Sequence, residues 1–299
     1  MKFWYFIVVF TFGIISCEDV IQVDVPTGET RLIVDALIRV DTTQEWLGLK
    51  VKVTETNNFF EELPVTSLET IDVIYTTTRE DGLVLNSGVS SLIDLDPGSG
   101  IYTPNPNFST EERISTATVL QGEDVLFTLI IQHKGRKYAA QTRYVPAAQL
   151  IRVEQGTETL FSEDETEVVV TFEDNPEIDN FYVFDFDFDE FLVSEDTFFN
   201  GQEFKFSYFY DKNLTPGQEV TVSILGADRT FYNYMDELLT QSEAPQGPFQ
   251  TPVTTVRGNV FDITGLDNIN IVDNAGRPND FPLGYFAIVQ EFKSTITIQ

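Results

Sequence analysis

One stretch of the chain, residues 181–191 with the sequence FYVFDFDFDEF, constrains the fold more than any other. Aromatic and acidic residues alternate there with a period of two, so a strand would carry rings on one face and Asp185, Asp187 and Asp189 on the other. Residues 202–210 repeat the alternation with Phe and Tyr. We therefore predict that these two segments are strands that pair antiparallel and place both aromatic rows in one core.

Short runs of β-branched residues separated by turn signals fill most of the remaining sequence. Asp81-Gly82 separates two such runs, and Lys134-Gly135 separates two others, so each dipeptide predicts a β-hairpin. Residues 284–299 form a further long strand-like run, and residues 268–282, rich in Asn, Asp, Gly and Pro, are typical of a surface loop. This pattern favours an all-β protein built from sandwiches.

The predicted domain organisation follows from the same turn signals. Pro146 cannot continue a central strand, so we place a domain boundary there. We expect an N-terminal Ig-like β-sandwich over residues 31–146 and a second β-sandwich domain over residues 147–299. The second domain should contain one short amphipathic helix over residues 231–241, capped by Asp228 or Thr230. Its apolar stripe has helical spacing and consists of Phe231, Tyr234, Met235, Leu238 and Leu239.

The N-terminus has the pattern of an export signal. Lys2 precedes an apolar run that is too short to cross a bilayer as a helix, and the run ends at Ser16-Cys17. Cys17 is the chain's sole cysteine and follows a small residue, as in a bacterial lipobox. We therefore expect residues 1–16 to be a lipoprotein signal peptide, Cys17 to be the lipidation site and residues 17–30 to be an acylated tether. A plain cleaved signal with an incidental cysteine is the alternative.

The charge balance limits the possible partners. The chain has 299 residues with 18 Lys+Arg against 48 Asp+Glu, a formal net charge of -30. Nucleic acid and anionic membrane surfaces need clustered cations, so we expect neither a nucleic-acid partner nor electrostatic membrane docking. The same charge suits a neutral or cationic cargo, or serves only to keep the surface soluble.

The residues offer little catalytic chemistry. His133 is the sole histidine and lies beside the Lys134-Gly135 turn, where we expect an exposed hairpin residue and not a catalyst. We interpret Trp46 as a packing or edge residue and not as a platform for a sugar ligand. Asp185, Asp187 and Asp189 lack the glycine of a calcium loop, and we interpret them as a solvated strand face. We predict no enzyme, no cofactor and no metal site, although the acids at residues 163–165 and 173–174 leave weak calcium binding open.

Several motifs along the chain resemble the DUF4249 lipoproteins of Bacteroidota, a domain of unknown function. The resemblance covers most of the sequence after the signal and is most specific toward the C-terminus, although the stretch between Asn259 and Gly284 is longer than the family pattern. The motifs are Cys17-Glu18-Asp19-Val20-Ile21, Arg31-Leu32-Ile33-Val34-Asp35, Gly100-Ile101-Tyr102, Tyr232-Asn233-Tyr234, Leu238, Gln241, Gly247-Pro248-Phe249, Pro252, Gly258-Asn259-Val260 and Leu283-Gly284-Tyr285-Phe286.

The resemblance implies a lipid-anchored outer-membrane protein, exposed at the cell surface or facing the periplasm, often found beside TonB-dependent receptors of the SusC type. It implies a non-catalytic accessory that captures a ligand or docks on the receptor, and it brings no catalytic residues. The alternative is a structural or adhesive surface lipoprotein without a barrel partner. A carboxylate hydrolase is a third reading, which two acids facing each other across a deep pocket would favour.

Overall fold

The fold is described from a computed structural model. It describes residues 30–57, 64, 66–107, 112–121, 124–176, 181–196, 201–212, 214–242, 255–266 and 280–299. The signal peptide, Cys17 and the predicted tether up to residue 29 lie outside the described residues, as does most of the predicted 268–282 loop.

Eight strands close into a barrel in the order β15-β1-β2-β5-β4-β3-β6-β7, and β15 pairs with β7 to complete the ring. The prediction of two Ig-like β-sandwich domains is therefore wrong. The reason is the last strand, which returns to the first: Val34 lies opposite Gly284 in a parallel pairing, and Ile288 lies opposite Tyr144. The barrel strands are β1 (Leu32–Val40), β2 (Val51–Glu55), β3 (Thr70–Thr78), β4 (Val84–Asp94), β5 (Ile101–Pro104), β6 (Asp124–His133), β7 (Arg136–Val145) and β15 (Leu283–Thr297).

Both predicted hairpins of the barrel are present. β3 and β4 pair antiparallel around Gly82, which has a φ of 81°. β6 and β7 are joined by Lys134 and Gly135 with φ of 50° and 70°, the left-handed pair that a tight two-residue hairpin requires. The dipeptide signals were sufficient here because these pairings are local in sequence.

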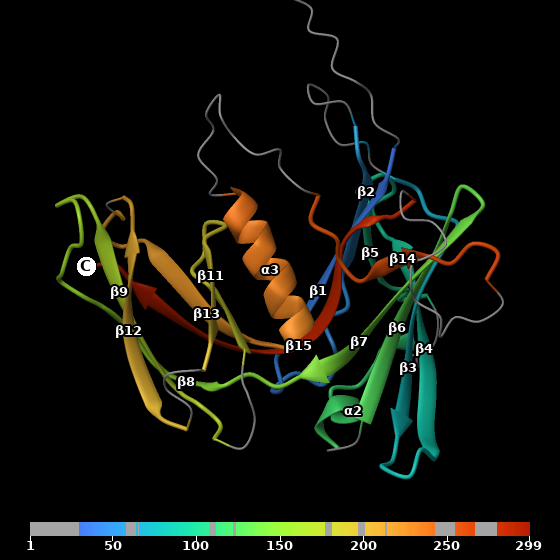
Figure 1. The fold of residues 1–299 in the computed structure, drawn as a ribbon, viewed down its shortest axis with the longest axis horizontal. Helices are drawn as coiled ribbons and strands as arrows, with labels where there is room; N and C mark the ends of the chain where they lie inside the picture. The colour runs from blue at the N-terminus through green and yellow to red at the C-terminus, as the bar shows by residue number, and fades with distance from the viewer. Residues whose placement is uncertain are drawn as a thin grey trace, which may run out of the picture.

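Beyond the barrel, the second half of β15 carries a sheet extension. β13 pairs antiparallel with β15, β10 pairs with β13, and β11 forms the edge, while β14 pairs with β7 on the barrel side. A separate three-stranded sheet in the order β12-β9-β8 lies beside this extension (Figure 1). These strands are β8 (Gln149–Gln155), β9 (Thr166–Glu173), β10 (Phe181–Asp185), β11 (Phe191–Glu195), β12 (Glu203–Tyr210), β13 (Glu219–Ala227) and β14 (Val260–Asp262).

The predicted strand over residues 181–191 is instead a hairpin, and its predicted pairing with residues 202–210 is wrong. Asp187, Phe188 and Asp189 all have positive φ, between 53° and 67°, and they turn the chain from β10 into β11. β12 pairs with β9 in the other sheet. The two aromatic rows nevertheless share one core, because the two sheets pack face to face.

Two helices lie in the described residues. α2 (Ala117–Leu120) is a single turn that the sequence analysis did not predict. α3 (Arg229–Ser242) contains the predicted helix, and the amide of Phe231 donates to the Asp228 carboxylate at 2.7 Å, which confirms Asp228 as the cap. Phe231 and Met235 are buried against β10, β13 and β15, whereas Leu238 is exposed, so only the first half of the predicted stripe packs on the sheet.

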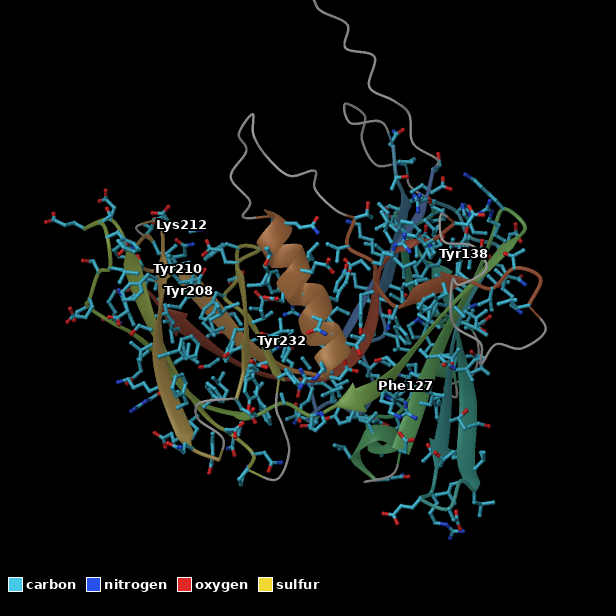
Figure 2. All side chains as sticks on the ribbon, viewed as in Figure 1. Phe127, Tyr138, Tyr208, Tyr210, Lys212 and Tyr232 are labelled. Carbon is cyan, nitrogen blue, oxygen red and sulfur yellow. The ribbon has the colours of Figure 1, made fainter. Side chains whose placement is uncertain are left out.

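The molecule therefore has two regions with different cores. The barrel core is mainly aliphatic around the fully buried Phe127, whereas the core between the extension and the three-stranded sheet is rich in aromatic residues and includes Tyr208 and Tyr210 (Figure 2). The β10–β13–β15 extension is the middle layer, with α3 on its other face. Strand β15 belongs to both regions.

Candidate functional site

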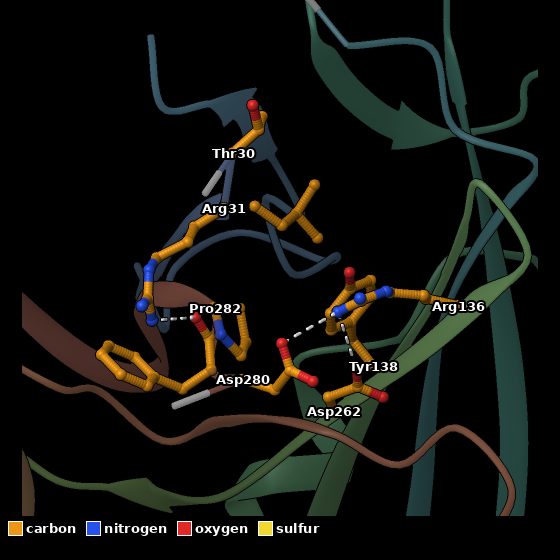
Figure 3. A pocket seen from close by; sticks show the side chains of 9 residues that line it. Thr30, Arg31, Arg136, Tyr138, Asp262, Asp280 and Pro282 are labelled. Atoms are coloured by element: carbon orange, nitrogen blue, oxygen red, sulfur yellow. Dashed lines mark hydrogen bonds and ion pairs between the residues drawn. The ribbon is translucent and has the colours of Figure 1, made fainter. Parts of the chain in front are cut away.

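A cavity of about 300 Å³ lies at one end of the barrel, where β1 and β15 begin and the β6–β7 turn is located. Strand β14, paired with β7, brings Asp262 to the same place. Figure 3 shows Arg31 and Arg136 on opposite sides of the cavity, with Asp280 between them. We call this cavity the barrel-mouth cavity. Its lining residues are Thr30, Arg31, Leu32, Arg136, Tyr138, Asp262, Asp280, Phe281 and Pro282.

Arg136 is the cation with the most acidic surroundings in this cavity. Its Nη1 lies 3.4 Å from the Asp262 carboxylate and 3.5 Å from the Asp280 carboxylate. Both distances exceed the 2.7–2.9 Å or so of a tight charge-assisted hydrogen bond. Asp262 is buried and also accepts the Thr264 amide at 2.8 Å, whereas Asp280 is partly exposed. Arg136 therefore lies between one buried and one partly exposed carboxylate, at long distances from both.

The protonation states of the cavity follow from its charges. The neighbouring Tyr138, with the Asp280 and Asp262 carboxylates, raises the pKa of Arg136 above its ordinary value. Burial, reinforced by the Asp262 charge, raises the pKa of the Tyr138 hydroxyl. At neutral pH the cavity therefore presents a guanidinium cation beside an un-ionised phenol, and both are hydrogen-bond donors.

Phe281 gathers two further arginines at the same place. The guanidinium of Arg31 and that of Arg257 each lie 3.8 Å from the centre of the Phe281 ring. Arg31 also donates to the Phe281 carbonyl at 3.2 Å, and its main chain is tied to Thr56 by two hydrogen bonds of 2.8 Å. The ring contacts are cation–π interactions, which keep both charges in position without neutralising them.

His133 lies near this end of the barrel and is buried, so the prediction of an exposed hairpin residue is wrong. Its Nε2 is 2.8 Å from Glu55 Oε1, and the Lys134 ammonium contacts both Glu55 oxygens at 2.8 and 2.9 Å. Within the described residues its Nδ1 has no hydrogen-bond partner. The reason is strand parity: Phe127, Leu129 and Ile131 of β6 face the barrel core, and His133 continues that row. The alternation of side chains along β6 could have predicted from the sequence that His133 is buried.

The Glu55 carboxylate is the charged partner in this cluster. Burial opposes its ionisation, but hydrogen bonds from Lys134 and His133 outweigh that cost and lower the pKa of Glu55 below its ordinary value. No serine, threonine or cysteine contacts His133 in the hydrogen-bond network of the described residues. The cluster links β2 to the β6–β7 turn.

The acids named in the sequence analysis serve the fold. Asp185 pairs with Arg39 at 2.6 Å, and Asp187 accepts the Thr221 amide at 3.3 Å, so the two do not form one solvated row. Asp174 is buried and accepts the Tyr182 hydroxyl, and Glu165 accepts amides of its own loop. Within the described ranges, no group of three His, Cys, Asp or Glu side chains is arranged to hold a metal ion.

Trp46 lies half-buried, with the Arg113 guanidinium 4.3 Å above its ring, and its main chain bridges to Ser115. This placement matches the packing role predicted for it. Cys17, the predicted lipidation site, lies outside the described residues and stays a prediction. Of the described helices, neither has the length and apolar character needed to cross a bilayer.

Comparison with known proteins gives one result. The family model DUF4249, described as a domain of unknown function, matches residues 18–266, which is most of the chain. No curated protein matches the sequence. The cavity residues Arg31, Arg136, Tyr138 and Asp262 fall within the matched range, as does Arg257, whereas Asp280 and Phe281 follow it.

Proposed function

Because this chain belongs to the DUF4249 family, we propose that it is a non-catalytic accessory lipoprotein of the outer membrane that captures a small solute for a TonB-dependent receptor of the SusC type. Acylation of Cys17 would hold it on the membrane, with residues 17–30 as the tether. The solute would bind in the barrel-mouth cavity. We further propose that the solute carries a carboxylate group.

The grouping of three arginines at one end of the barrel is the observation that carries this proposal. The chain has only 18 Lys+Arg against 48 Asp+Glu, yet Arg31, Arg136 and Arg257 meet around the cavity and Phe281. The excess of negative charge over the rest of the molecule makes this local positive group stand out. An anionic solute repelled elsewhere on the surface would be attracted here.

The geometry of Arg136 supports a carboxylate as the group that is recognised. Its contacts with Asp262 and Asp280 are long, so a bidentate ligand carboxylate can replace the partly exposed Asp280 without leaving Asp262 unpaired. The un-ionised hydroxyl of Tyr138 belongs to the same cavity. A cavity of about 300 Å³ fits a ligand the size of a sugar acid or an acylated amino acid.

The position of the cavity supports a membrane-proximal role. Thr30, which lines the cavity, is the last residue of the predicted tether. A tether of residues 17–30 would therefore hold this end of the barrel nearest the lipid surface. A solute bound there would lie close to the opening of a receptor in the same membrane.

The binding part of the proposal is tested with matched probes by saturation-transfer NMR on the mature protein. We expect binding of glucuronate, acetate or N-acetylalanine and no binding of their uncharged counterparts glucose, acetamide and N-acetylalaninamide. Arg136→Met should weaken that binding at least tenfold. Arg143→Met is the control, because Arg143 lies on the same strand and pairs with Asp124. Equal binding of charged and uncharged probes, or of neither, would contradict the cargo assignment.

The receptor part needs its own experiment. We expect that the acylated protein, extracted in detergent from its native membrane, co-purifies with a TonB-dependent receptor identified by mass spectrometry. A Cys17→Ala variant, which cannot be acylated, is the control for membrane retention. Absence of any receptor above background would favour the structural or adhesive alternative.

A further inference from the structure

The connection between β8 and β9 presents the most exposed apolar side chains of the described surface. Phe161 is 90% exposed and Leu160 is 59% exposed. The connection between β8 and β9 lies at the end of the molecule opposite the barrel (Figure 1). Exposed Phe and Leu side chains that adjoin each other mark interaction sites more often than isolated ones do. We call residues 156–165 the β8–β9 loop.

The β8–β9 loop has a fixed conformation that keeps these side chains outward. The Glu165 carboxylate accepts the amides of Leu160 and Phe161, the latter at 3.1 and 3.2 Å. The same backbone hydrogen bonds lower the pKa of Glu165, so the carboxylate stays ionised at neutral pH. These bonds close a tight turn over residues 160–165 around the carboxylate, and both apolar side chains are exposed on its outside.

A second carboxylate fixes the base of the loop. Buried Glu167 accepts the Glu158 amide at 2.8 Å and the Ser207 hydroxyl at 2.5 Å. Gly156 is required beside it, because a Cβ atom there would lie 1.9 Å from the Glu167 carboxylate. A loop ordered before binding loses little conformational entropy when a partner covers it.

The surroundings of Phe161 are acidic. Glu158, Glu163 and Asp164 are exposed in the same loop, and residues 156–167 contain no Lys or Arg. A cavity of about 620 Å³ adjoins the loop and is lined by Glu158, Glu163, Glu165 and Glu167 together with neutral residues. Such a surface repels anionic lipid and also repels the same loop of a second copy. It complements an apolar socket that is rimmed by Lys and Arg.

We propose that Leu160 and Phe161 form a docking element for a partner protein with an apolar socket bordered by basic residues. The rings and methyl groups enter the socket, and the acids of the loop pair with its basic rim. This element lies at the opposite end of the molecule from the barrel-mouth cavity, so it stands independently of the proposed solute capture.

Site-specific photo-crosslinking in the native cell tests this proposal. Benzoylphenylalanine replaces Phe161 in the full-length protein, and the control carries it at Leu266, an exposed apolar residue 42% accessible on the barrel side. We expect one protein crosslinked at position 161 and not at 266, with the crosslinked peptide in an apolar surface bordered by Lys or Arg. The purified pair should then bind, and Phe161→Ser should weaken that binding tenfold or more.

Two further variants test the charge argument in the same purified pair. Glu163→Gln with Asp164→Asn should slow association and reduce its dependence on salt, while Leu266→Ser should change neither. An unchanged thermal melt by circular dichroism shows that each variant is folded. A crosslink only to a second copy, flotation of the protein with phosphatidylglycerol vesicles through Phe161, an acidic partner surface, or no crosslink at 161 would each overturn the proposal.

Discussion

The barrel and the sheet extension bury their hydrophobic cores with different kinds of side chain. The barrel core is mainly Val, Leu and Ile from eight strands, and its closure leaves no strand edge within the ring. The extension keeps an open edge at β11 and is held by aromatic rings from facing sheets. Packing of aromatic rings between the layers therefore stabilises the extension, whereas backbone hydrogen bonding between neighbouring strands closes the barrel.

The aromatic contacts of the extension are specific in geometry. Phe186 and Tyr208 stack with ring centres 3.7 Å apart and planes 9° apart, and Phe184 meets Phe206 edge-on at 5.1 Å. Each pair joins residues from different sheets. Such pairs contribute about 0.5–1.5 kcal/mol beyond the burial of their area. The two predicted aromatic rows therefore meet across the layers and not as neighbouring paired strands.

Strand β15 joins the two regions, and substitution of its glycine, Gly284, is predicted to destabilise the protein more than any other change. A Cβ on Gly284 would lie 1.9 Å from the Val34 carbonyl oxygen of β1, and its φ is 93°. We expect Gly284→Ala to destabilise the protein by about 3–5 kcal/mol, since backbone strain adds to a clash that side chains cannot relieve. Urea unfolding followed by circular dichroism measures the change in the free energy of unfolding.

Gly82→Ala is the matched control for this variant. Gly82 also has a positive φ, 81°, but no atom lies within 4 Å of its added Cβ. It should cost only the backbone strain, about 1–2 kcal/mol. Equal losses in the two variants would show that the close approach of β15 to β1 contributes nothing.

The aromatic core should be nearly as sensitive. Phe172 is buried and contacts the rings of Tyr182, Phe184, Phe204 and Phe206. We expect Phe172→Ala to cost about 3–5 kcal/mol, because the sheets cannot collapse into the space left. In the protein without residues 1–16, Trp46 is the sole tryptophan and reports on the barrel, so its fluorescence shows whether the loss reaches the other region.

The control here is Phe161→Ala, which removes an exposed ring from the same region and should change stability by about 0.5 kcal/mol or less. If Phe172→Ala shifts the tyrosine signal in near-ultraviolet circular dichroism but leaves the Trp46 transition in place, then the two regions unfold separately despite sharing β15.

An ion cluster at the junction should have an intermediate effect. Arg39 of β1 pairs with Asp185 of β10 at 2.6 Å and with Glu291 of β15 at 3.2 Å, and Glu291 is largely buried. Arg39→Met leaves Asp185 without its cation and Glu291 with only the longer contact to Lys293 at 3.6 Å, and we expect a loss of about 1–3 kcal/mol. Arg79→Met breaks the exposed pair with Asp81 and should cost less than about 0.5 kcal/mol. Equal losses of stability in the two variants would show that the Arg39 ion cluster does not stabilise the junction between the barrel and the extension.

The smallest predicted effect concerns acid stability at the barrel mouth. The pKa of Glu55 is lower in the folded state, so its ionised form stabilises the protein above the ordinary glutamate pKa of about 4.3. That contribution is lost as the pH falls from there through the lower folded pKa. We expect Glu55→Gln to be less stable at pH 7 by about 1 kcal/mol and to lose less stability between pH 5 and 3, the exposed Glu80→Gln serving as control. Parallel pH profiles for Glu55→Gln and the unaltered protein would contradict this.

The sequence was sufficient where the structure is local. Asp81-Gly82 and Lys134-Gly135 located two hairpins, and Asp228 with its apolar stripe located α3. The barrel could not be predicted, because alternation is the same in a sandwich and in a barrel, and nothing local indicates that β15 pairs in parallel with β1. The turn at Asp187 has no glycine, so its left-handed backbone left no signal.

The candidate site was equally inaccessible to local reasoning. Arg31, Arg136 and Asp262 come from three strands or strand ends that are distant in sequence. Closure of the barrel brings Arg31 to this end of β7, and the pairing of β14 with β7 adds Asp262. The net charge of -30 favoured a neutral or cationic cargo, because net charge is a sum over the whole chain. The barrel-mouth cavity is richer in arginine than the chain as a whole, so its local charge supports an anionic ligand.

The most direct test of the proposed solute site is a titration of the mature protein with the carboxylate probe that binds best, followed through the arginine Nε–H signals in ¹H–¹⁵N spectra. Arg31 and Arg136 should shift and saturate together, while Arg39 at the junction and Arg152 on β8 stay unchanged. Shifts at Arg152 without shifts at Arg136, or no saturable shift at either cavity arginine, would contradict ligand capture at the barrel mouth.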